Sequence, residues 1–415
     1  MLLKKLIKNI PQEKKVINIK GISINSKNIK KDFIFFAIKG IKLNGENYIK
    51  EAIKKGATVV VCSKHYKIRD KNILFVRTSR IRKLLSEISA KFYKLKPKNI
   101  IAVTGTNGKT SVADLFYQIL SLNNIPVASI GTLGIKYKNR TIKSELTSPD
   151  TIELHQLLEK IKKNNIDNVI IEASSHGLYQ NRIDHLNLKA GIFTNFSQDH
   201  LDYHKSMKSY LNSKLILFND ILSTNKVIIS DKFLKEFSIL KKISIKKNLR
   251  LIDINKVMKK LQRNKNLKLN EFQLKNLSMS IIAAKLCNLK ERKIFNTLNK
   301  IKDVDGRLEL ARVFPNNIKV FVDFAHTPDA LTKSIDSLTA TNGENISLVF
   351  GCGGERDFKK RPLMGKIAST RCKKIYVTDD NPRNENPKKI RSDIIKGIKN
   401  SKIHEIGNRN RAINY

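Results

Sequence analysis

Five polar segments of this 415-residue chain carry residue types that could bind phosphate groups, a metal ion or a charged ligand. The sharpest is residues 104–110, TGTNGKT, which follows the apolar run 100–103. Its two glycines allow backbone N–H groups to turn inward around phosphate oxygens, and the helix that follows offers its N-terminus to the same anion. Lys109 can neutralise the β- and γ-phosphates, and the Thr110 hydroxyl can ligate Mg²⁺. The segment predicts a phosphate-binding loop, although Val103 stands where the P-loop spacing has its first glycine.

Two further segments end strand-like apolar runs in polar residues. Residues 171–178, IEASSHGL, place Glu172 where a carboxylate could hold Mg²⁺, but the His-Gly pair that follows is equally typical of a plain turn. A later burst, FTNFSQDHLDYH, brings two aspartates and two histidines within six positions. His200 and His204 have the i, i+4 spacing of a zinc pair, but no third ligand is evident and the phosphate loop favours magnesium.

Two charged loops follow predicted strands near the end of the chain. Residues 350–357, FGCGGERD, combine a glycine-rich turn with Arg356, which suits binding of a carboxylate or a phosphate. Residues 379–383, DDNPR, present both signs of charge, as an amino acid ligand would require. A solvated surface loop is the alternative interpretation of these residues.

The elements that must position these segments alternate between strands and helices, which predicts an α/β protein. A helix over 48–55 and a linker over 94–99 precede the phosphate loop, and a helix over 111–122 follows it. A third block starts near Leu308. The predicted strands are residues 16–19, 33–38, 58–62, 73–76, 100–103, 168–171, 190–194, 226–230, 319–323, 347–350 and 374–378.

The composition is strongly basic, with 81 Lys and Arg against 36 Asp and Glu, a net charge of +45. The lysines are spread through every segment beside abundant Ile and Asn, so AT-rich codon usage explains the charge; a functional basic surface is the alternative. No apolar stretch approaches a membrane span, and the opening MLLKKLIKNI is too short and charged for a secretory signal. Four scattered cysteines fit a reduced, cytoplasmic protein.

Together these motifs resemble the Mur ligase family over residues 23–415. GTNGKT marks the superfamily that also contains folylpolyglutamate synthetases, and EASSHGL, FTNFSQDHLDYH, VDFAHTPDAL and FGCGGERD narrow the resemblance to the tripeptide synthetases. DDNPR resembles the signature of members that add meso-diaminopimelate. The resemblance implies three α/β domains: residues 1–98 for the UDP-substrate, a central P-loop-type ATP domain over 99–307, and a Rossmann-like amino-acid-binding domain over 308–415. Family members continue further, so we expect the last domain to be C-terminally truncated.

The resemblance also implies a reaction and its participants. An ATP-dependent ligase with Mg²⁺ would form an acyl phosphate on UDP-MurNAc-L-Ala-D-Glu and join meso-diaminopimelate to it, in peptidoglycan synthesis. We expect a cytoplasmic monomer with no specific nucleic-acid partner and no membrane partner. Two alternatives stay open: a folylpolyglutamate synthetase-like ligase, and a truncated, non-catalytic remnant that binds nucleotides or nucleic acid.

Residue roles follow from the matching motifs alone. Lys109, Glu172, His200 and Lys214 would be catalytic, and Lys214 matches the lysine that is carbamylated in this family, which would turn it into an oxygen ligand. The adenine-side Gly-Phe-Asn of the family is Glu-Phe-Gln here, at residues 271–273. The implied sites are Gly105, Thr106, Asn107, Gly108, Lys109, Thr110, Ser111, Asn276, Arg307 and Asp323 for ATP, with His326 on the same side; Ser26, the neighbourhood of 41–43, Thr147, Ser148, Ser174, Gln180 and Arg182 for the UDP-MurNAc dipeptide; Arg356, Asp380, Asn381, Pro382 and Arg383 for diaminopimelate; and Thr110, Glu172, His200 and carbamylated Lys214 for the metal.

Overall fold

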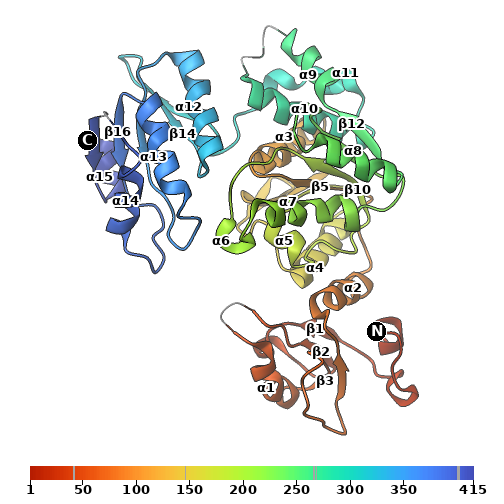
Figure 1. Cartoon of the computed structure of the whole chain (residues 1–415). Helices are drawn as coiled ribbons and strands as arrows, with labels where there is room; N and C mark the ends of the chain where they lie inside the picture. The colour runs from red at the N-terminus through yellow and green to blue at the C-terminus, as the bar shows by residue number, and fades with distance from the viewer. Residues whose placement is uncertain (41–42, 145, 265–266, 268, 400–401) are drawn as a thin grey trace.

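Three lobes follow one another along the chain in the computed structural model, which describes residues 1–40, 43–144, 146–264, 267, 269–399 and 402–415 (Figure 1). The first lobe lies at the bottom of the view, the middle lobe above it and the third at the upper left. Each lobe contains parallel strands with helices packed against them, which confirms the α/β prediction.

The first lobe is built on a parallel sheet in the order β1-β2-β3-β4. Three of its predicted strands are present with nearly the predicted bounds, but the strand predicted at 16–19 is wrong. That segment makes only an isolated bridge from Asn18 to Leu2, and Val16 is exposed, so its apolar residues pack the N-terminal turn instead of pairing in the sheet. The elements are β1 (Gly21–Ser23), β2 (Phe33–Phe36), α1 (Ile49–Lys54), β3 (Ala57–Cys62), β4 (Leu74–Arg77) and α2 (Ile81–Phe92).

The middle lobe holds an eight-stranded sheet in the order β12-β11-β10-β5-β9-β6-β7-β8, in which only β7 and β8 run antiparallel to their neighbours. Its strands are β5 (Asn99–Thr104), β6 (Val127–Gly131), β7 (Gly134–Tyr137), β8 (Arg140–Ile142), β9 (Asn168–Glu172), β10 (Leu188–Phe193), β11 (Val227–Ser230) and β12 (Arg250–Asp253). Its helices are α3 (Lys109–Leu122), α4 (Thr151–Lys163), α5 (Ser175–Tyr179), α6 (Leu201–His204), α7 (Met207–Ile216), α8 (Phe237–Lys246), α9 (Asn255–Gln262), α10 (Glu271–Leu286) and α11 (Glu291–Phe295).

Both faces of this sheet are covered, which is why its strands read as continuous apolar runs. Along β5, Ile101 and Val103 point into a core shared with α3 and α10, whereas Ile100 and Ala102 point into a second core shared with α4 and α8. Figure 1 shows α3 and α10 on one side of the strands and α4, α5 and α7 on the other. The buried sheet therefore gives the middle lobe a rigid frame.

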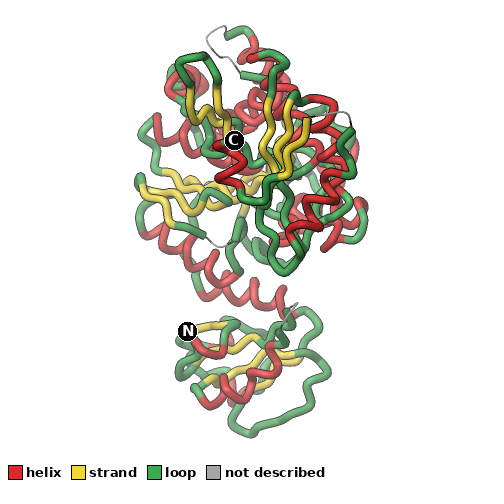
Figure 2. Tube along the Cα trace, turned by 90° about the vertical axis from the view of Figure 1, so that its left-hand side faces the viewer, coloured by secondary structure: helices red, strands yellow, loops and turns green. Residues whose placement is uncertain are grey.

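The third lobe contains two separate sheets, seen apart in Figure 2. One is the antiparallel hairpin β13–β14, and the other is the parallel sheet β15-β16-β17, whose core includes residues of α12, α13 and α14. The hairpin leaves Val313, Ile318 and Val322 exposed. The elements are β13 (Glu309–Val313), β14 (Lys319–Val322), α12 (Pro328–Asn342), β15 (Ser347–Phe350), α13 (Lys360–Arg371), β16 (Lys374–Val377), α14 (Pro387–Ile395), β17 (Lys402–Glu405) and α15 (Arg409–Asn414).

The carboxyl ends of the central strands meet at one edge of the middle sheet. Phe193 of β10 pairs with Thr104 of β5, and Glu172 of β9 pairs with Val103. The chain leaves β5 toward β6 on one side and later returns to β10 on the other, so the connections diverge at this point. Such an edge is where open α/β sheets hold their ligands. Within the described residues, no helix has the length and apolar character needed to span a membrane.

Candidate active site

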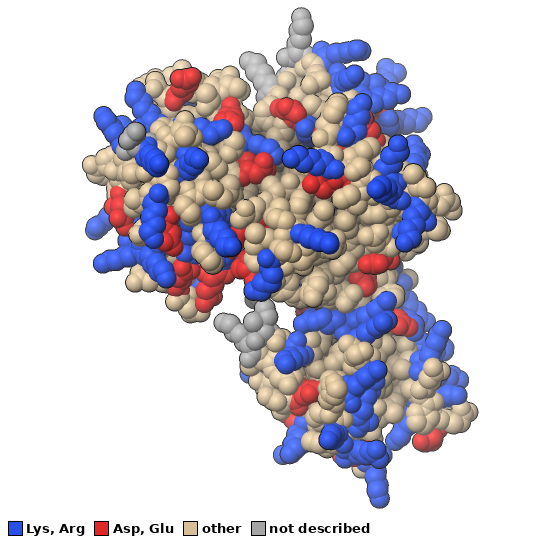
Figure 3. Space-filling view, in the orientation of Figure 1, with Lys and Arg blue, Asp and Glu red and all other residues tan. Residues whose placement is uncertain are grey.

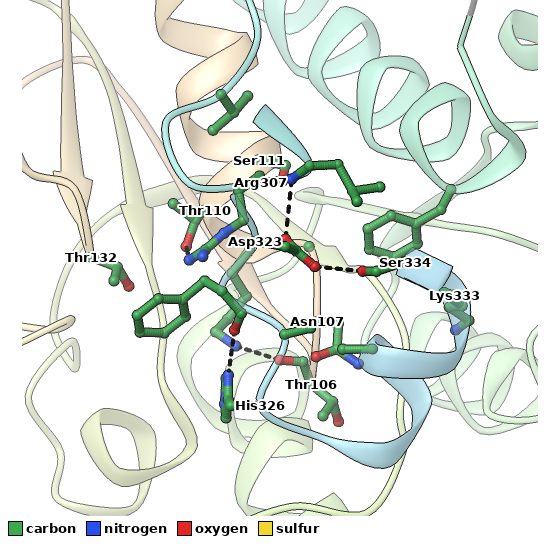
Figure 4. A pocket seen from close by; sticks show the side chains of 18 of the residues that line it. Thr106, Asn107, Thr110, Ser111, Thr132, Arg307, Asp323, His326, Lys333 and Ser334 are labelled. Atoms are coloured by element: carbon green, nitrogen blue, oxygen red, sulfur yellow. Dashed lines mark hydrogen bonds between the residues drawn. The ribbon is translucent and has the colours of Figure 1, made fainter. Parts of the chain in front are cut away.

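A cavity of about 630 Å³ opens at this edge and is lined by both the middle and the third lobes (Figure 4). The close view shows Thr110 and Arg307 pointing toward one another and the Asp323 carboxylate accepting a hydrogen bond from the Ser334 hydroxyl. The predicted site residues that line the cavity are Thr106, Asn107, Gly108, Lys109, Thr110, Ser111, Thr147, Glu172, Ser174, His200, Lys214, Asn276, Arg307, Asp323, His326, Arg356, Asp380, Asn381 and Arg383.

The loop between β5 and α3 needs both of its glycines. Gly105 has φ +147° and Gly108 has φ +85°, a region that side chains rarely adopt. A Cβ atom on Gly105 would also lie 1.8 Å from the Thr194 hydroxyl oxygen. From the end of β10, Asn195 braces the loop: its Oδ1 accepts a hydrogen bond from the Asn107 N–H at 2.9 Å, and its Nδ2 donates to the Asn107 carbonyl at 3.0 Å.

Two lysines are buried against this loop and donate to the same carbonyl oxygen. Lys109 Nζ lies 3.0 Å from Gly105 O, and Lys214 Nζ lies 2.7 Å from it. Burial lowers the pKa of Lys109, and Glu172 partly opposes that shift. Burial, reinforced by the charge of Lys109, holds the pKa of Lys214 well below its usual value. Lys214 also lies 4.3 Å from the ring centre of Tyr210. The local environment therefore favours a neutral amine at Lys214.

Glu172 is the acidic centre of the site. Its carboxylate accepts hydrogen bonds from the Thr110 hydroxyl at 3.0 Å and from the Thr132 N–H at 2.8 Å. Arg307 Nη2 donates to the same Thr110 hydroxyl at 3.1 Å. Burial raises the pKa of Glu172, whereas Lys109 lowers it. Carboxylate, hydroxyl and guanidinium thus converge beside the N-terminus of α3.

His200 lines the same cavity from the loop after β10 and has a left-handed φ of +54°. Its Nε2 lies 3.3 Å from Asp199 Oδ2, and its buried Nδ1 has no hydrogen-bond partner among the residues that the structure describes. Burial lowers the pKa of His200 to about 3, although Asp199 opposes the shift. Burial raises the pKa of Asp199, but the hydrogen bond from His326 and the charges of His200 and Lys360 outweigh it and leave that pKa below its usual value. A neutral imidazole with a free nitrogen is a metal ligand or a hydrogen-bond acceptor.

The residues expected to contact the dipeptide divide into two groups. Thr147 and Ser174 line the cavity, whereas Ser148, Gln180 and Arg182 are not among its lining residues. Arg182 donates to the Ser148 backbone carbonyl at 2.8 Å and to Gln180 Oε1 at 2.8 Å. The arginine therefore links the Ser148 backbone to the Gln180 side chain.

Ser26 is not brought into the cavity. It lies in the first lobe, where its hydroxyl donates to Glu51 Oε2 at 2.8 Å. Of the neighbouring segment expected to bind nucleotide, residues 41 and 42 lie outside the described residues, and Leu43 is exposed.

The charged loops of the third lobe face the same cavity. Arg383, with φ +51°, donates from Nη1 to the Gly354 carbonyl at 2.6 Å, which ties the DDNPR loop to the glycine-rich loop. Asp380 Oδ1 lies 3.6 Å from Nη1 of Arg409, a residue that the motifs did not indicate. Pro382 does not line the cavity.

The segment expected on the adenine side uses its polar residue for structure. Phe272 and Gln273 both line the cavity, and Gln273 also closes a capping box with Asn270 at the start of α10. Asn270 Nδ2 also donates to Ser337 of the third lobe at 2.6 Å.

Sequence reasoning missed several residues of the site, because each is brought in by a distant element. Thr132 follows β6, whereas Asp199 and Lys360 meet only through contact between the middle and third lobes. Asp199 stood beside a selected histidine, which was the only signal for it. The zinc alternative for the two histidines gains no third ligand: no three His, Cys, Asp or Glu side chains are placed to hold one ion within the part of the chain that the structure describes.

Three domain families of the Mur ligases match successive parts of the chain. The Mur ligase family catalytic domain matches residues 18–93, the Mur ligase middle domain matches residues 103–298, and the glutamate ligase domain of Mur ligases matches residues 306–415.

Curated relatives and solved structures agree with these matches. UDP-N-acetylmuramoyl-L-alanyl-D-glutamate–2,6-diaminopimelate ligase of Rickettsia bellii is 39% identical, over 96% of this chain and 87% of that protein. The ligase of the same name from Brucella melitensis is 33% identical, over 97% and 87%. A solved structure with this ligase name superposes with a TM-score of 0.70 at 25% identity, over 100% of this chain and 90% of that chain. A Mycobacterium tuberculosis folylpolyglutamate synthase complexed with ADP and AMPPCP shares the fold, with a TM-score of 0.62 at 15% identity, over 80% and 86%.

Proposed function

The chain belongs to the Mur ligase family, and on this premise we propose that it adds meso-diaminopimelate to UDP-N-acetylmuramoyl-L-alanyl-D-glutamate with consumption of ATP. The family resemblance and the three-domain α/β architecture are thereby confirmed. One observation carries the proposal: a single cavity joins a phosphate loop to charged loops of a second lobe that suit an amino acid. We divide the chain at 98/99 and 307/308 into substrate, ATP and amino-acid domains.

The phosphate loop supports the first half of the reaction. The N-terminus of α3 and Lys109 would hold the β- and γ-phosphates of ATP, with Arg307 beside Thr110 at the same end. Asn276 and Asp323 would lie toward the nucleoside. The γ-carboxylate of the substrate's D-glutamate would attack the γ-phosphorus, and ADP would leave. Lys109 lies where it can neutralise the charge that develops in this transfer.

The chemistry of the side chains around Glu172 fits a magnesium ion. Glu172 and Thr110 supply oxygen, and the unpartnered Nδ1 of His200 is a free donor atom in the same cavity. When bound, Mg²⁺ would supply charge screening between the phosphates and the carboxylate that must approach them.

Lys214 completes this set only if it is carbamylated. Its depressed pKa favours the neutral amine, which can attack the carbon of CO₂ and lose a proton, leaving a carbamate. The carbamate is an anionic oxygen ligand for Mg²⁺, whereas the ammonium form of Lys214 would repel the ion. This supports the role that the family resemblance implied.

The third lobe would present the incoming amino acid. Its amine displaces phosphate from the acyl phosphate, and its proton is released as the amide bond forms. Arg383 can pair with the distal carboxylate of diaminopimelate, which lysine lacks, while Arg356 and Asp380 offer charges for the other end. The first lobe, with Ser26, would bind the uridine end of the substrate.

We place this reaction in the cytoplasm and in a monomer, with no nucleic-acid or membrane partner. The cysteines at 62, 287, 352 and 372 are all buried free thiols, which suits a reducing compartment.

The test is ADP release by the purified protein with UDP-MurNAc-L-Ala-D-Glu, ATP, Mg²⁺ and either meso-diaminopimelate or lysine. We expect release with diaminopimelate and at least tenfold less with lysine, because lysine lacks the distal carboxylate with which Arg383 would pair. Arg383→Ala should raise the diaminopimelate KM by one to two powers of ten (about 1.5–3 kcal/mol) and barely change lysine use. Equal use of both amino acids by the unmutated protein would refute the assigned specificity. No ADP release with either would refute the ligase assignment.

A further inference from the structure

Asp199 lies at the junction of the middle and third lobes and is almost completely buried, at 3% exposure. Two cationic or imidazole side chains of the third lobe approach its carboxylate: His326 Nε2 at 3.4 Å and Lys360 Nζ at 3.5 Å. On its own lobe the same carboxylate lies 3.3 Å from His200 Nε2 and accepts a hydrogen bond from the backbone N–H of His200 at 2.9 Å. The Asp199 side chain therefore contacts both the third lobe and the ring of His200.

Neighbouring contacts follow the same junction. Gln198, the residue before Asp199, donates to Asp357 of the third lobe at 3.0 Å. At the tip of the phosphate loop, Asn107 donates to Asp329 at 3.0 Å and accepts from the Thr327 hydroxyl at 3.4 Å. The third lobe thus docks on the phosphate loop and on the segment after β10, the two parts of the middle lobe that carry Lys109 and His200.

The charges at this junction depend on one another. Lys360 is 5% exposed, so both members of the pair lose their contact with water when the lobes meet. Removing one member leaves the other buried and unpaired, and that penalty falls on the docked arrangement alone, because water solvates both groups when the lobes separate.

We propose that Asp199 is a positioning residue that latches the third lobe against the phosphate loop and, through the same carboxylate, fixes the ring of His200. The latch rests on the proposed function only for its purpose, which is to bring the amino acid to the reacting carboxylate. Docking itself is a property of the free protein and is measured without any substrate.

The experiment measures docking by energy transfer between two dyes in substrate-free protein. The native cysteines are buried, so Lys235→Cys in the middle lobe and Lys366→Cys in the third, both at exposed positions, offer selective attachment sites. In this background Asp199→Asn and Lys360→Met should each shift the ratio of docked to undocked molecules by about tenfold or more toward undocked. Lys359→Met is the matched control, because Lys359 is the exposed neighbour of Lys360, and it should change nothing.

Two further arms separate the latch from other effects. Lys360→Arg keeps a cation and should stay docked, which shows that Lys360→Met acts through charge. The double variant Asp199→Asn/Lys360→Met should be no more open than the more open single variant, because the two residues act through each other. Thermal melts and far-UV circular dichroism confirm that each variant folds, and a variant that does not fold is replaced by Asp199→Ser.

The possible outcomes bear differently on the two proposals. Unchanged energy transfer in both single variants overturns the latch, even if both lose activity, because Asp199 would then act on His200 alone. An additive double variant also overturns it. Clear undocking in the variants of a protein that shows no ligase activity supports the latch and overturns the proposed function. In an active protein, Lys360→Met should raise the KM for the amino acid more than the KM for ATP.

Discussion

At the residue scale, the site is dominated by two buried lysines that share the Gly105 carbonyl as acceptor. A carbonyl oxygen satisfies hydrogen-bond donors but cannot neutralise two positive charges. The carboxylate that most opposes the lowering of the Lys109 pKa is Glu172. The two lysines therefore have different tasks: Lys109 stays available for phosphate charge, whereas Lys214 is driven toward the neutral amine.

Lys109→Ala should abolish ATP turnover, with a loss of roughly 10²-fold or more in kcat, because the side chain supplies charge at the transferring phosphoryl group. Glu172 loses the nearby charge of Lys109 but keeps its hydrogen bonds from Thr110 and Thr132, so the melting temperature should change little. ADP release and a thermal melt are measured on the same sample. Turnover near that of the unmutated protein would show that the loop does not bind the reacting phosphates.

Lys214→Ala should be nearly inactive, and acetate should restore part of the activity by replacing the lost carbamate oxygens. Depleting bicarbonate should also lower the activity of the unmutated protein. Lys208→Ala is the control on the same helix, since Lys208 is exposed, and it should behave like the unmutated protein. An intact mass without the carbamate, together with no response to acetate, would argue against this role.

Spacing within a motif was enough to predict the side chains that one strand and its following loop place together. Lys109, Thr110 and Glu172 meet in the cavity because β5 and β9 are adjacent parallel strands that end at the same edge. Asp199 and Lys360 could not be paired in this way, because 160 residues and a change of lobe separate them. Ser26 was selected by resemblance alone, and it lies away from the cavity.

At the element scale, the end of β10 supports the phosphate loop that follows β5. Asn195→Ala removes both hydrogen bonds to Asn107 and should weaken nucleotide binding by about tenfold or more, at about 1 kcal/mol for each bond. Titration calorimetry with ADP measures this directly. Asn212→Ala, at an exposed position of α7, should bind ADP normally. Equal affinity of both variants would mean that the loop holds its shape without β10.

A buried histidine of α4 sets part of the acid sensitivity of the fold. His155 is fully buried, and neither ring nitrogen has a close hydrogen-bond partner among the described residues. Burial, reinforced by the charge of Lys96, lowers its pKa to about 3, although the Asp184 backbone opposes the shift. The unfolded chain takes up a proton there below about pH 6.5, whereas the folded protein does not until about pH 3. The free energy of unfolding should therefore fall by at most about 1.4 kcal/mol per pH unit between those values from this group.

His155→Leu should remove that contribution, because leucine cannot take up a proton in the unfolded state. Urea unfolding at pH 7.5, 5.5 and 4.5 compares the two proteins, and the variant should lose less stability toward acid. The stability at pH 7.5 should be similar or higher, since an unpartnered polar ring is replaced by an apolar one. A parallel loss in both proteins would show that other groups control the acid response.

The elements themselves were predictable where both faces of a strand are buried. The apolar runs at 100–103 and 168–171 became β5 and β9 with nearly the predicted bounds, because no register leaves such a run half in water. The run at 16–19 looked the same in sequence but lies outside the sheet. Whether a strand has a partner in a sheet depends on the tertiary structure and cannot be inferred from local composition. Helix α2 was not predicted, although its apolar residues at 81, 84, 85, 88 and 92 have the spacing of one helix face.

At the scale of the whole molecule, the charge is dispersed rather than gathered. Figure 3 shows Lys and Arg over all three lobes of the visible face, with Asp and Glu among them. We expect only weak binding of a labelled DNA duplex at 50 mM salt and its loss by 200 mM, as for non-specific phosphate contacts. Fluorescence anisotropy at the two salt concentrations measures it. Tight binding that survives 200 mM salt would establish a functional basic surface instead of codon bias.

Among the described residues, each lobe has its own buried apolar core, and this has a thermodynamic consequence. Melting one lobe leaves the apolar interior of the others intact, so heat denaturation should proceed in steps and the molecule has no single free energy of unfolding. The third lobe, whose core is small and whose hairpin exposes valines, should melt at the lowest temperature. A ligand that fills the cavity touches two lobes at once, so calorimetry with ATP and amino acid bound should show the upper and lower transitions drawing together.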